Sequence, residues 1–227
     1  MLSEECKRFF ALNFPFWDKL SQTEYDLFCK MTYLEKYSKG QNIHSGTHEC
    51  TGAIFVKSGC VRAYILSEDG REITLYRLYK NDICMLSASC VLQSITFDVF
   101  VDAEEDSEVY IINGKTFADI SNKNLYVKNF ALEIAIKRFS SVMWIMQRIL
   151  FMSLDRRVAI FLYDELQKTG SRDIKLTHAD VAKYMGSARE AVSRMLKYFE
   201  DENIVELSRG GIKIIDVPAL KRYAENA

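Results

Sequence analysis

The spacing of hydrophobic and polar positions changes along the chain, and each change predicts a different kind of element. Between about residues 37 and 112, short β-branched or alternating runs are separated by glycine-containing turns, which is typical of β-strands. Between residues 123 and 152, apolar side chains recur every three or four positions, which predicts a long helix. Short helical periods and two β-branched runs follow. The pattern therefore predicts an α+β chain with parts at 1–122, 123–152 and 153–227.

The segment Leu176–Lys197 predicts two short helices joined by a turn. Thr177 is a suitable N-cap for the first helix, with an aspartate three positions later. Gly186 suits the left-handed conformation that often ends a helix. Ser187 has a glutamate three positions later, which is the spacing of a capping box, so we expect the second helix to open at Ser187.

The second of these helices has two opposite faces. Its apolar stripe is made by Val192, Met195, Leu196 and Phe199, and its polar stripe is made by Glu190, Ser193, Arg194 and Lys197. An acceptor, a hydroxyl and two cations on one face suit the base edges and phosphates of a DNA major groove. An ordinary helical hairpin with a solvated polar face would have the same spacing.

Two short β-branched runs follow this helix pair. Ile204–Leu207 and Ile212–Ile215 are joined by a Ser-Arg-Gly-Gly turn, which predicts a β-hairpin. The hairpin carries cations at Arg209 and Lys213. A hairpin directly after a reading helix predicts a winged helix, whose tip reaches the adjacent DNA backbone.

The run Arg189-Glu190-Ala191-Val192-Ser193-Arg194 resembles the R-E-x-V-S-R run of the Crp/Fnr family of bacterial transcription regulators. Looser motifs of that family's effector domain occur in the same order, with K-G-Q at 39–41, V-K-S-G-C-V-R at 56–62 and S-E-D-G-R-E-I at 67–73. The resemblance covers almost the whole chain. It implies an N-terminal double-stranded β-helix barrel like a cyclic-nucleotide-binding domain, a long dimerisation helix and a C-terminal winged helix-turn-helix.

The resemblance also implies specific DNA contacts. Arg189 and Arg194 would hydrogen-bond guanine or phosphate, Glu190 would accept a hydrogen bond from a cytosine amine, and Ser193 would tune base choice. The planar guanidinium fork matches guanine O6 and N7, which supports this role for the arginines. The predicted DNA-binding residues are Thr177, Ser187, Arg189, Glu190, Ser193, Arg194, Lys197, Arg209 and Lys213.

The net charge gives no general attraction to DNA. The whole chain has a formal charge of −1, and residues 153–227 carry 13 Lys and Arg against 12 Asp and Glu. Binding would therefore depend on where individual cations lie, and non-specific affinity should be modest and sensitive to salt.

The predicted long helix carries two apolar lines. One is a heptad line formed by Leu132, Ile136, Phe139, Met143, Met146 and Leu150, and beside it run Val142, Ile145, Ile149 and Met152. One line could meet a partner helix while the other packs on the chain's own domain, although a single buried core helix has the same pattern. The resemblance favours a homodimer with two reading helices about 34 Å apart on a palindromic operator, and it implies RNA polymerase as a further partner.

The region that matches the family's cyclic-nucleotide site has the wrong chemistry for that ligand. Met85 and Leu86 stand where the family's Gly-Glu pair would be. No Lys or Arg occurs from Asn81 through Gly114, so a phosphate there would need a cation from the long helix, at Lys137 or Arg138. Cyclic nucleotide is therefore disfavoured as the effector.

Haem and thiol chemistry remain open for the same region. Cys84-Met85 matches the C-M-H run of the family's carbon-monoxide-sensing haem member, but Leu86 stands where that member has histidine. Cys84 and Cys90 could also form a redox switch, or they could be small buried hydrophobic residues. The predicted effector residues are Cys84, Met85, Leu86 and Cys90, and the effector itself stays unidentified.

Other classes of function lack their signatures. The chain has three histidines and no phosphate loop, catalytic triad order or paired-carboxylate motif, so we expect no enzyme. His44, His48 and Cys50 fit no standard metal spacing, so no metal is expected. No apolar run could span a membrane and the cysteines show no secretory context, so a cytoplasmic protein is expected. The alternative of a ligand-binding module without DNA binding leaves the two arginines of the R-E-x-V-S-R run without a role.

Overall fold

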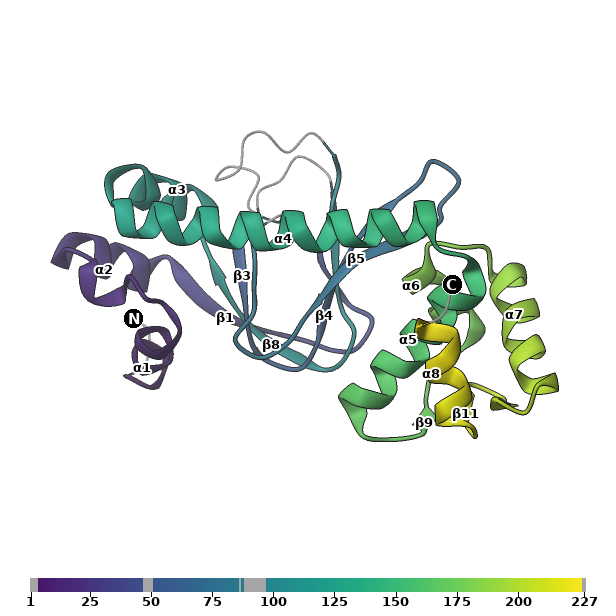
Figure 1. Cartoon of the computed structure of the whole chain (residues 1–227). Helices are drawn as coiled ribbons and strands as arrows, with labels where there is room; N and C mark the ends of the chain where they lie inside the picture. The colour runs from purple at the N-terminus through teal and green to yellow at the C-terminus, as the bar shows by residue number, and fades with distance from the viewer. Residues whose placement is uncertain (1–3, 47–50, 86, 88–96, 226–227) are drawn as a thin grey trace. The chain divides into compact units, whose positions relative to one another are not determined.

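The computed structural model describes residues 4–46, 51–85, 87 and 97–225, and it divides into two compact units (Figure 1). The first unit comprises Met1–Ile65 and Leu75–Val142. The second comprises Leu66–Thr74 and Met143–Ala227. None of the described helices is long and apolar enough to cross a membrane.

The strands of the N-terminal half form two antiparallel sheets. In the described residues, one four-stranded sheet has the order β1-β8-β3-β6 and the other has the order β2-β7-β4-β5. The strands are β1 (Thr32–Tyr37), β2 (Asn42–His44), β3 (Ala53–Ser58), β4 (Val61–Leu66), β5 (Glu72–Leu78), β6 (Ile83–Cys84), β7 (Phe100–Ala103) and β8 (Ser107–Ile112). This order is that of a double-stranded β-helix, so the predicted fold is confirmed.

Helices and aromatic rings close one side of the first sheet. The helical elements are α1 (Glu4–Asn13), the short η1 (Trp17–Lys19), α2 (Gln22–Lys30) and α3 (Gly114–Lys123). Phe10 on α1 is fully buried, with its ring centroid 4.9 Å from that of Tyr110 on β8. Phe14 packs edge-on against Phe55 of β3, with centroids 5.0 Å apart. These rings join the helices to the sheet in one apolar core.

A single long helix, α4 (Leu125–Phe151), follows α3 (Figure 1). Val127 and Ala131 are buried in the core of the first unit, and Val142 packs against the core between the sheets. Asn124 accepts hydrogen bonds from the backbone N–H groups of Tyr126 and Val127, which satisfies donors of the first turn.

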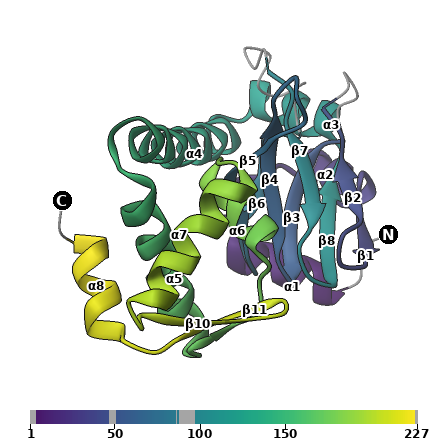
Figure 2. The ribbon, with the colours of Figure 1, turned by 90° about the vertical axis from the view of Figure 1, so that its right-hand side faces the viewer.

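The C-terminal part is a helical domain with a small sheet (Figure 2). Its elements are α5 (Leu154–Thr169), β9 (Asp173–Ile174), α6 (His178–Met185), α7 (Arg189–Asp201), β10 (Val205–Ser208), β11 (Gly211–Ile214) and α8 (Val217–Glu225). Every one of these elements contributes to one core, in which Val158, Val181 and Leu220 are fully buried. The predicted winged helix-turn-helix is confirmed, with β9 as a third strand beside β11.

Candidate nucleic-acid interface

Helix α6 begins and ends with the capping residues that the sequence predicts. Thr177 is the N-cap of α6, and it forms a full capping box with Asp180. Its Oγ1 accepts a hydrogen bond from the Asp180 backbone N–H at 3.1 Å, and the Asp180 carboxylate accepts one from the Thr177 backbone N–H at 2.9 Å. Gly186 ends α6 with φ +58°, a left-handed conformation that favours glycine.

The prediction that Ser187 opens the second helix is wrong. The N-cap of α7 is Ala188, without a side-chain cap, and the helix begins at Arg189. The reason is that the Ser187 backbone N–H donates to the carbonyl of Ala182 at 3.1 Å, which closes α6. Ser187 therefore belongs to the end of α6. The extended residue Ala188 follows it before α7 starts. The expected capping box of Ser187 with Glu190 does not form.

Helix α7 buries its apolar stripe and exposes its polar stripe. Val192, Leu196 and Phe199 are completely buried, whereas Met195 is partly buried. The side chains exposed on the opposite side are Arg189, Glu190, Arg194 and Lys197, and Ser193 is half-buried between the two faces. The helix therefore presents a continuous polar face, as the sequence pattern predicts.

Lys197 differs from the two arginines on this face. Its Nζ lies 2.9 Å from the carboxylate of Glu200 and 3.1 Å from that of Asp201. The hydrogen bond to Glu200 raises the pKa of Lys197, and the same bond lowers the pKa of Glu200. The charge of Lys197 is thus largely balanced within its own helix, and Lys197 offers less to a phosphate than Arg189 or Arg194 does.

Ser193 has a partner that the sequence did not reveal. The Ser193 Oγ and the His178 Nδ1 are 3.0 Å apart. This contact joins the first residue of α6 to the middle of α7. Their separation in sequence is 15 residues, so no local spacing indicates the contact.

The hairpin β10–β11 forms the predicted wing. Val205 pairs with Ile214 and Ser208 with Gly211, and Gly210 has φ +82° at the tip. Arg209 at this tip is exposed. Lys213 is also exposed, with its Nζ 3.9 Å from the carboxylate of Glu206. The wing thus places one cation at its tip and a second on its outer surface.

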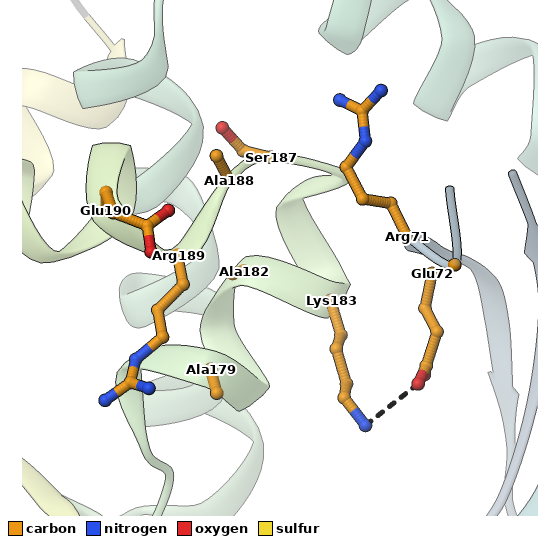
Figure 3. Close-up of a pocket in the computed structure, with 10 residues that line it drawn as sticks. Arg71, Glu72, Ala179, Ala182, Lys183, Ser187, Ala188, Arg189 and Glu190 are labelled. Atoms are coloured by element: carbon orange, nitrogen blue, oxygen red, sulfur yellow. Dashed lines mark ion pairs between the residues drawn. The ribbon is translucent and has the colours of Figure 1, made fainter. Parts of the chain in front are cut away.

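The loop Leu66–Thr74 belongs to the same compact unit as α6 and α7, and it borders a small pocket at the start of the reading helix (Figure 3). The pocket volume is about 290 Å³. Lys183 on α6 lies 3.0 Å from the carboxylate of Glu72, and the Thr74 hydroxyl donates to the Lys183 carbonyl at 3.3 Å. Cations and carboxylates are mixed around the pocket, which gives no single-sign site for a small ion.

Arg157 on α5 stabilises the turn between α6 and α7. Its Nη1 donates to the carbonyl of Met185 at 2.8 Å, which satisfies a terminal acceptor of α6. Burial lowers the pKa of the Arg157 guanidinium. This arginine is a structural residue of the turn that the sequence analysis did not single out.

The predicted dimer residues form an uncovered line on α4. The six side chains have between 42% and 66% of their area exposed, and they are Leu132, Ile136, Phe139, Met143, Met146 and Leu150. The second apolar line, with Val142 and Ile149, is only partly exposed. The two lines of the helix thus differ in burial, although both are apolar.

The predicted effector residues lie partly outside the described residues. Leu86 and Cys90 are outside them, as are His48 and Cys50 of the loop considered for metal binding. Cys84 is fully buried, with its Sγ 3.7 Å from the Tyr76 hydroxyl, and Met85 is buried in the core beside α1. Among the residues with assigned structure, no group of three or more His, Cys, Asp or Glu side chains is placed to hold a metal ion.

Arg138 on α4 brings a cation to the described part of this region. Its Nη2 donates to the carbonyl of Ile83 at 3.2 Å and lies 3.4 Å from a carboxylate oxygen of Asp82. Its guanidinium lies over the ring of Tyr76, 4.6 Å from the centroid. Burial raises the pKa of Tyr76 well above its usual value, so this phenol stays protonated beside Cys84.

Comparison with known proteins gives consistent matches for both units. The family model for the Crp-like helix-turn-helix domain matches residues 156–223, and the model for the cyclic nucleotide-binding domain matches residues 34–124. A crystal structure from Eubacterium rectale, described as a transcriptional regulator of the Crp/Fnr family, is 42% identical, with a TM-score of 0.91 over 95% of this chain and 100% of that chain.

More distant curated relatives are regulators too. The fumarate and nitrate reduction regulatory protein of Yersinia pestis is 27% identical over 83% of this chain and 77% of its own length. The cAMP-activated global transcriptional regulator CRP of Salmonella typhimurium is 25% identical over 78% of this chain and 87% of its own length.

The capping box at α6 gives a first testable prediction. Replacing Thr177 with Ala should lower the free energy of unfolding by about 1 kcal/mol, because a helix donor loses its acceptor. Thr177→Ser keeps the hydroxyl and should retain most of the stability. Urea unfolding followed by circular dichroism measures both, and equal midpoints for the Ala variant and the unmodified chain would contradict the capping role.

Proposed function

Because the chain belongs to the Crp/Fnr family of transcription regulators, we propose that two copies of it bind a palindromic DNA operator together. The observation that carries the proposal is the polar face of α7, which exposes Arg189, Glu190 and Arg194. On the opposite face Val192, Leu196 and Phe199 are completely buried. The N-terminal β-domain would hold an effector that controls binding.

The reading chemistry is that of a helix in the major groove. A guanidinium can donate two hydrogen bonds to O6 and N7 of one guanine, and a carboxylate can accept from a cytosine amine. Arg194 and Glu190 supply these groups on adjacent turns. Arg209 at the wing tip and Arg189 at the start of α7 supply further cations for phosphates, which fix the register of the protein on the duplex.

Dimerisation through α4 brings two reading helices to one operator. The apolar line on α4 has roughly half of its side-chain area exposed to water, which is unfavourable. Covering this area with another apolar surface would therefore stabilise the assembly. The heptad spacing of that line matches the geometry in which two helices pack along their length. A two-fold axis along α4 then gives two reading helices one DNA turn apart, about 34 Å, and a palindromic site.

The effector that controls the dimer is not a cyclic nucleotide in this proposal. A cyclic phosphate needs a cation, and Arg138 is the candidate that reaches the region. That guanidinium already faces the Asp82 carboxylate and lies over the Tyr76 ring. A phosphate would therefore have to displace a carboxylate of the same charge, which supports an effector of different chemistry.

Haem is also poorly matched to the residues described. A haem-ligating thiolate needs open space above the sulfur, whereas the Cys84 side chain is fully buried and faces the Tyr76 hydroxyl. The packing supports a structural role for Cys84.

Control then works through the equilibrium between dimer geometries. An effector shifts that equilibrium only if it binds the DNA-competent geometry with a different affinity. A bound dimer would act on transcription through RNA polymerase, and its work would lie in the cytoplasm with the DNA.

The reading role of Arg194 is testable by substitution. Arg194→Ala should weaken binding to a specific operator by about 1–3 kcal/mol, because its bidentate contact is lost. Lys197→Ala is the matched control on the same face and should have a smaller effect, since Glu200 and Asp201 already balance its charge. Fluorescence anisotropy with a labelled duplex measures both, and an unchanged affinity for Arg194→Ala would remove the recognition claim.

The dimer role of α4 has its own test. Phe139→Glu places a charge in the middle of the proposed interface and should give a monomer at micromolar concentration, because the charge would be buried without a partner. Leu12→Glu is the control, since Leu12 is 77% exposed on α1. Sedimentation velocity gives the masses, and a Phe139→Glu variant that stays dimeric would contradict this interface.

The exclusion of cyclic nucleotides is tested by thermal unfolding. Millimolar cyclic AMP should leave the melting temperature unchanged, since a ligand that does not bind the folded state cannot stabilise it. A saturable rise in melting temperature with cyclic AMP concentration would show that the site accepts the nucleotide after all.

A further inference from the structure

The hydrogen bond between Ser193 and His178 ties a predicted reading residue to a residue that the sequence analysis did not single out, and it is unusual for a helical serine. A serine inside a helix commonly donates to the carbonyl four residues earlier. Among the described helical residues, Ser141 donates to the Lys137 carbonyl at 3.0 Å and Thr169 to the Glu165 carbonyl at 2.8 Å in this way. In the described part of the chain, the partner of the Ser193 hydroxyl is instead the His178 ring, at 3.0 Å.

The protonation of the His178 Nδ1 determines whether the Ser193 hydroxyl can still donate a hydrogen bond to DNA. A hydroxyl has one proton and two lone pairs, and the Nδ1 of histidine is either an acceptor or a donor. If Nδ1 accepts, the Ser193 proton is used and only lone pairs remain for DNA. If Nδ1 carries the proton, it donates to Oγ and leaves the Ser193 proton free.

This difference corresponds to a difference between bases. In the major groove, adenine N6 and cytosine N4 are amines that donate, whereas guanine O6 and thymine O4 are carbonyls that accept. The amine and the carbonyl occupy equivalent places on the two purines, and likewise on the two pyrimidines. A freely rotating serine hydroxyl can bond to either kind of base. A hydroxyl that donates to the histidine has only lone pairs left for DNA, whereas one that accepts from the histidine keeps its proton and one lone pair, both in directions set by the ring.

We propose that His178 is a positioning residue that fixes the direction of the Ser193 hydroxyl, and that it thereby makes Ser193 discriminate amine-bearing from carbonyl-bearing bases. His178 is the first residue of α6, so the contact joins both helices of the helix-turn-helix. The inference rests on the proposed function, because it requires α7 to read base edges.

The test uses a duplex whose sequence the unmodified protein selects from a random pool, together with its single-base variants. The unmodified protein should discriminate amine from carbonyl bases at one position of each half-site, by about fivefold. His178→Ala should reduce this ratio to near one, as should Ser193→Ala. Adding Ser193→Ala to His178→Ala should not change the ratio further, because the histidine acts only through the serine.

A second substitution keeps a hydrogen-bond partner for Ser193 but allows that partner only to accept. His178→Asp supplies a carboxylate that can only accept, so Ser193 would donate to it and present lone pairs to DNA. Amine-bearing bases should then be preferred at that position. An aspartate in the first turn of α6 also suits the helix dipole, so this variant should fold.

The outcomes separate the two levels of the proposal. If His178→Ala lowers affinity equally for all duplexes and keeps the original base preference, the positioning role is wrong while operator binding stands. A His178→Asp variant that prefers carbonyl-bearing bases would also overturn it. If the unmodified protein selects no sequence from the pool, the proposed function itself is wrong.

Discussion

The burial of one face of α7 is the constraint on which the rest of this molecule's function depends. Val192, Leu196 and Phe199 are completely buried in the core of the second unit, so the helix cannot rotate about its axis without exposing them. That fixed rotation is what projects Arg189 and Arg194 outward. The left-handed Gly186 and the hydrogen bond from Arg157 to the Met185 carbonyl hold the start of the helix. Stability and recognition therefore use opposite faces of the same element.

The long helix α4 likewise uses some of its residues for packing within the chain and leaves others exposed for a partner. Residues near its start, such as Val127 and Ala131, are buried in the core of the first unit, whereas its heptad line stays uncovered. In our proposal a second copy covers that line. Effector binding in the β-domain and DNA reading by α7 would then be linked through one element, since α4 contributes residues to both compact units.

The sequence predicted the fold class and the polar face of α7 because both follow from periodicity and from short turn signals such as Thr177 and Gly186. It missed β1, whose residues after Thr32 are mostly exposed and therefore show little alternation. It placed the start of α7 one residue early because spacing alone could not show that the Ser187 backbone closes α6. Contacts between distant residues, such as that of His178 with Ser193, depend on how the helices pack, and no local pattern encodes them.

The symmetry of the DNA that the unmodified protein selects from a random-sequence duplex pool tests the central claim most directly. Two copies paired through α4 and reading with α7 predict an inverted repeat, with half-site centres about 10 base pairs apart. An asymmetric site without a repeat would contradict the dimeric arrangement. The absence of any enriched sequence would contradict the assignment of α7 as a reading helix.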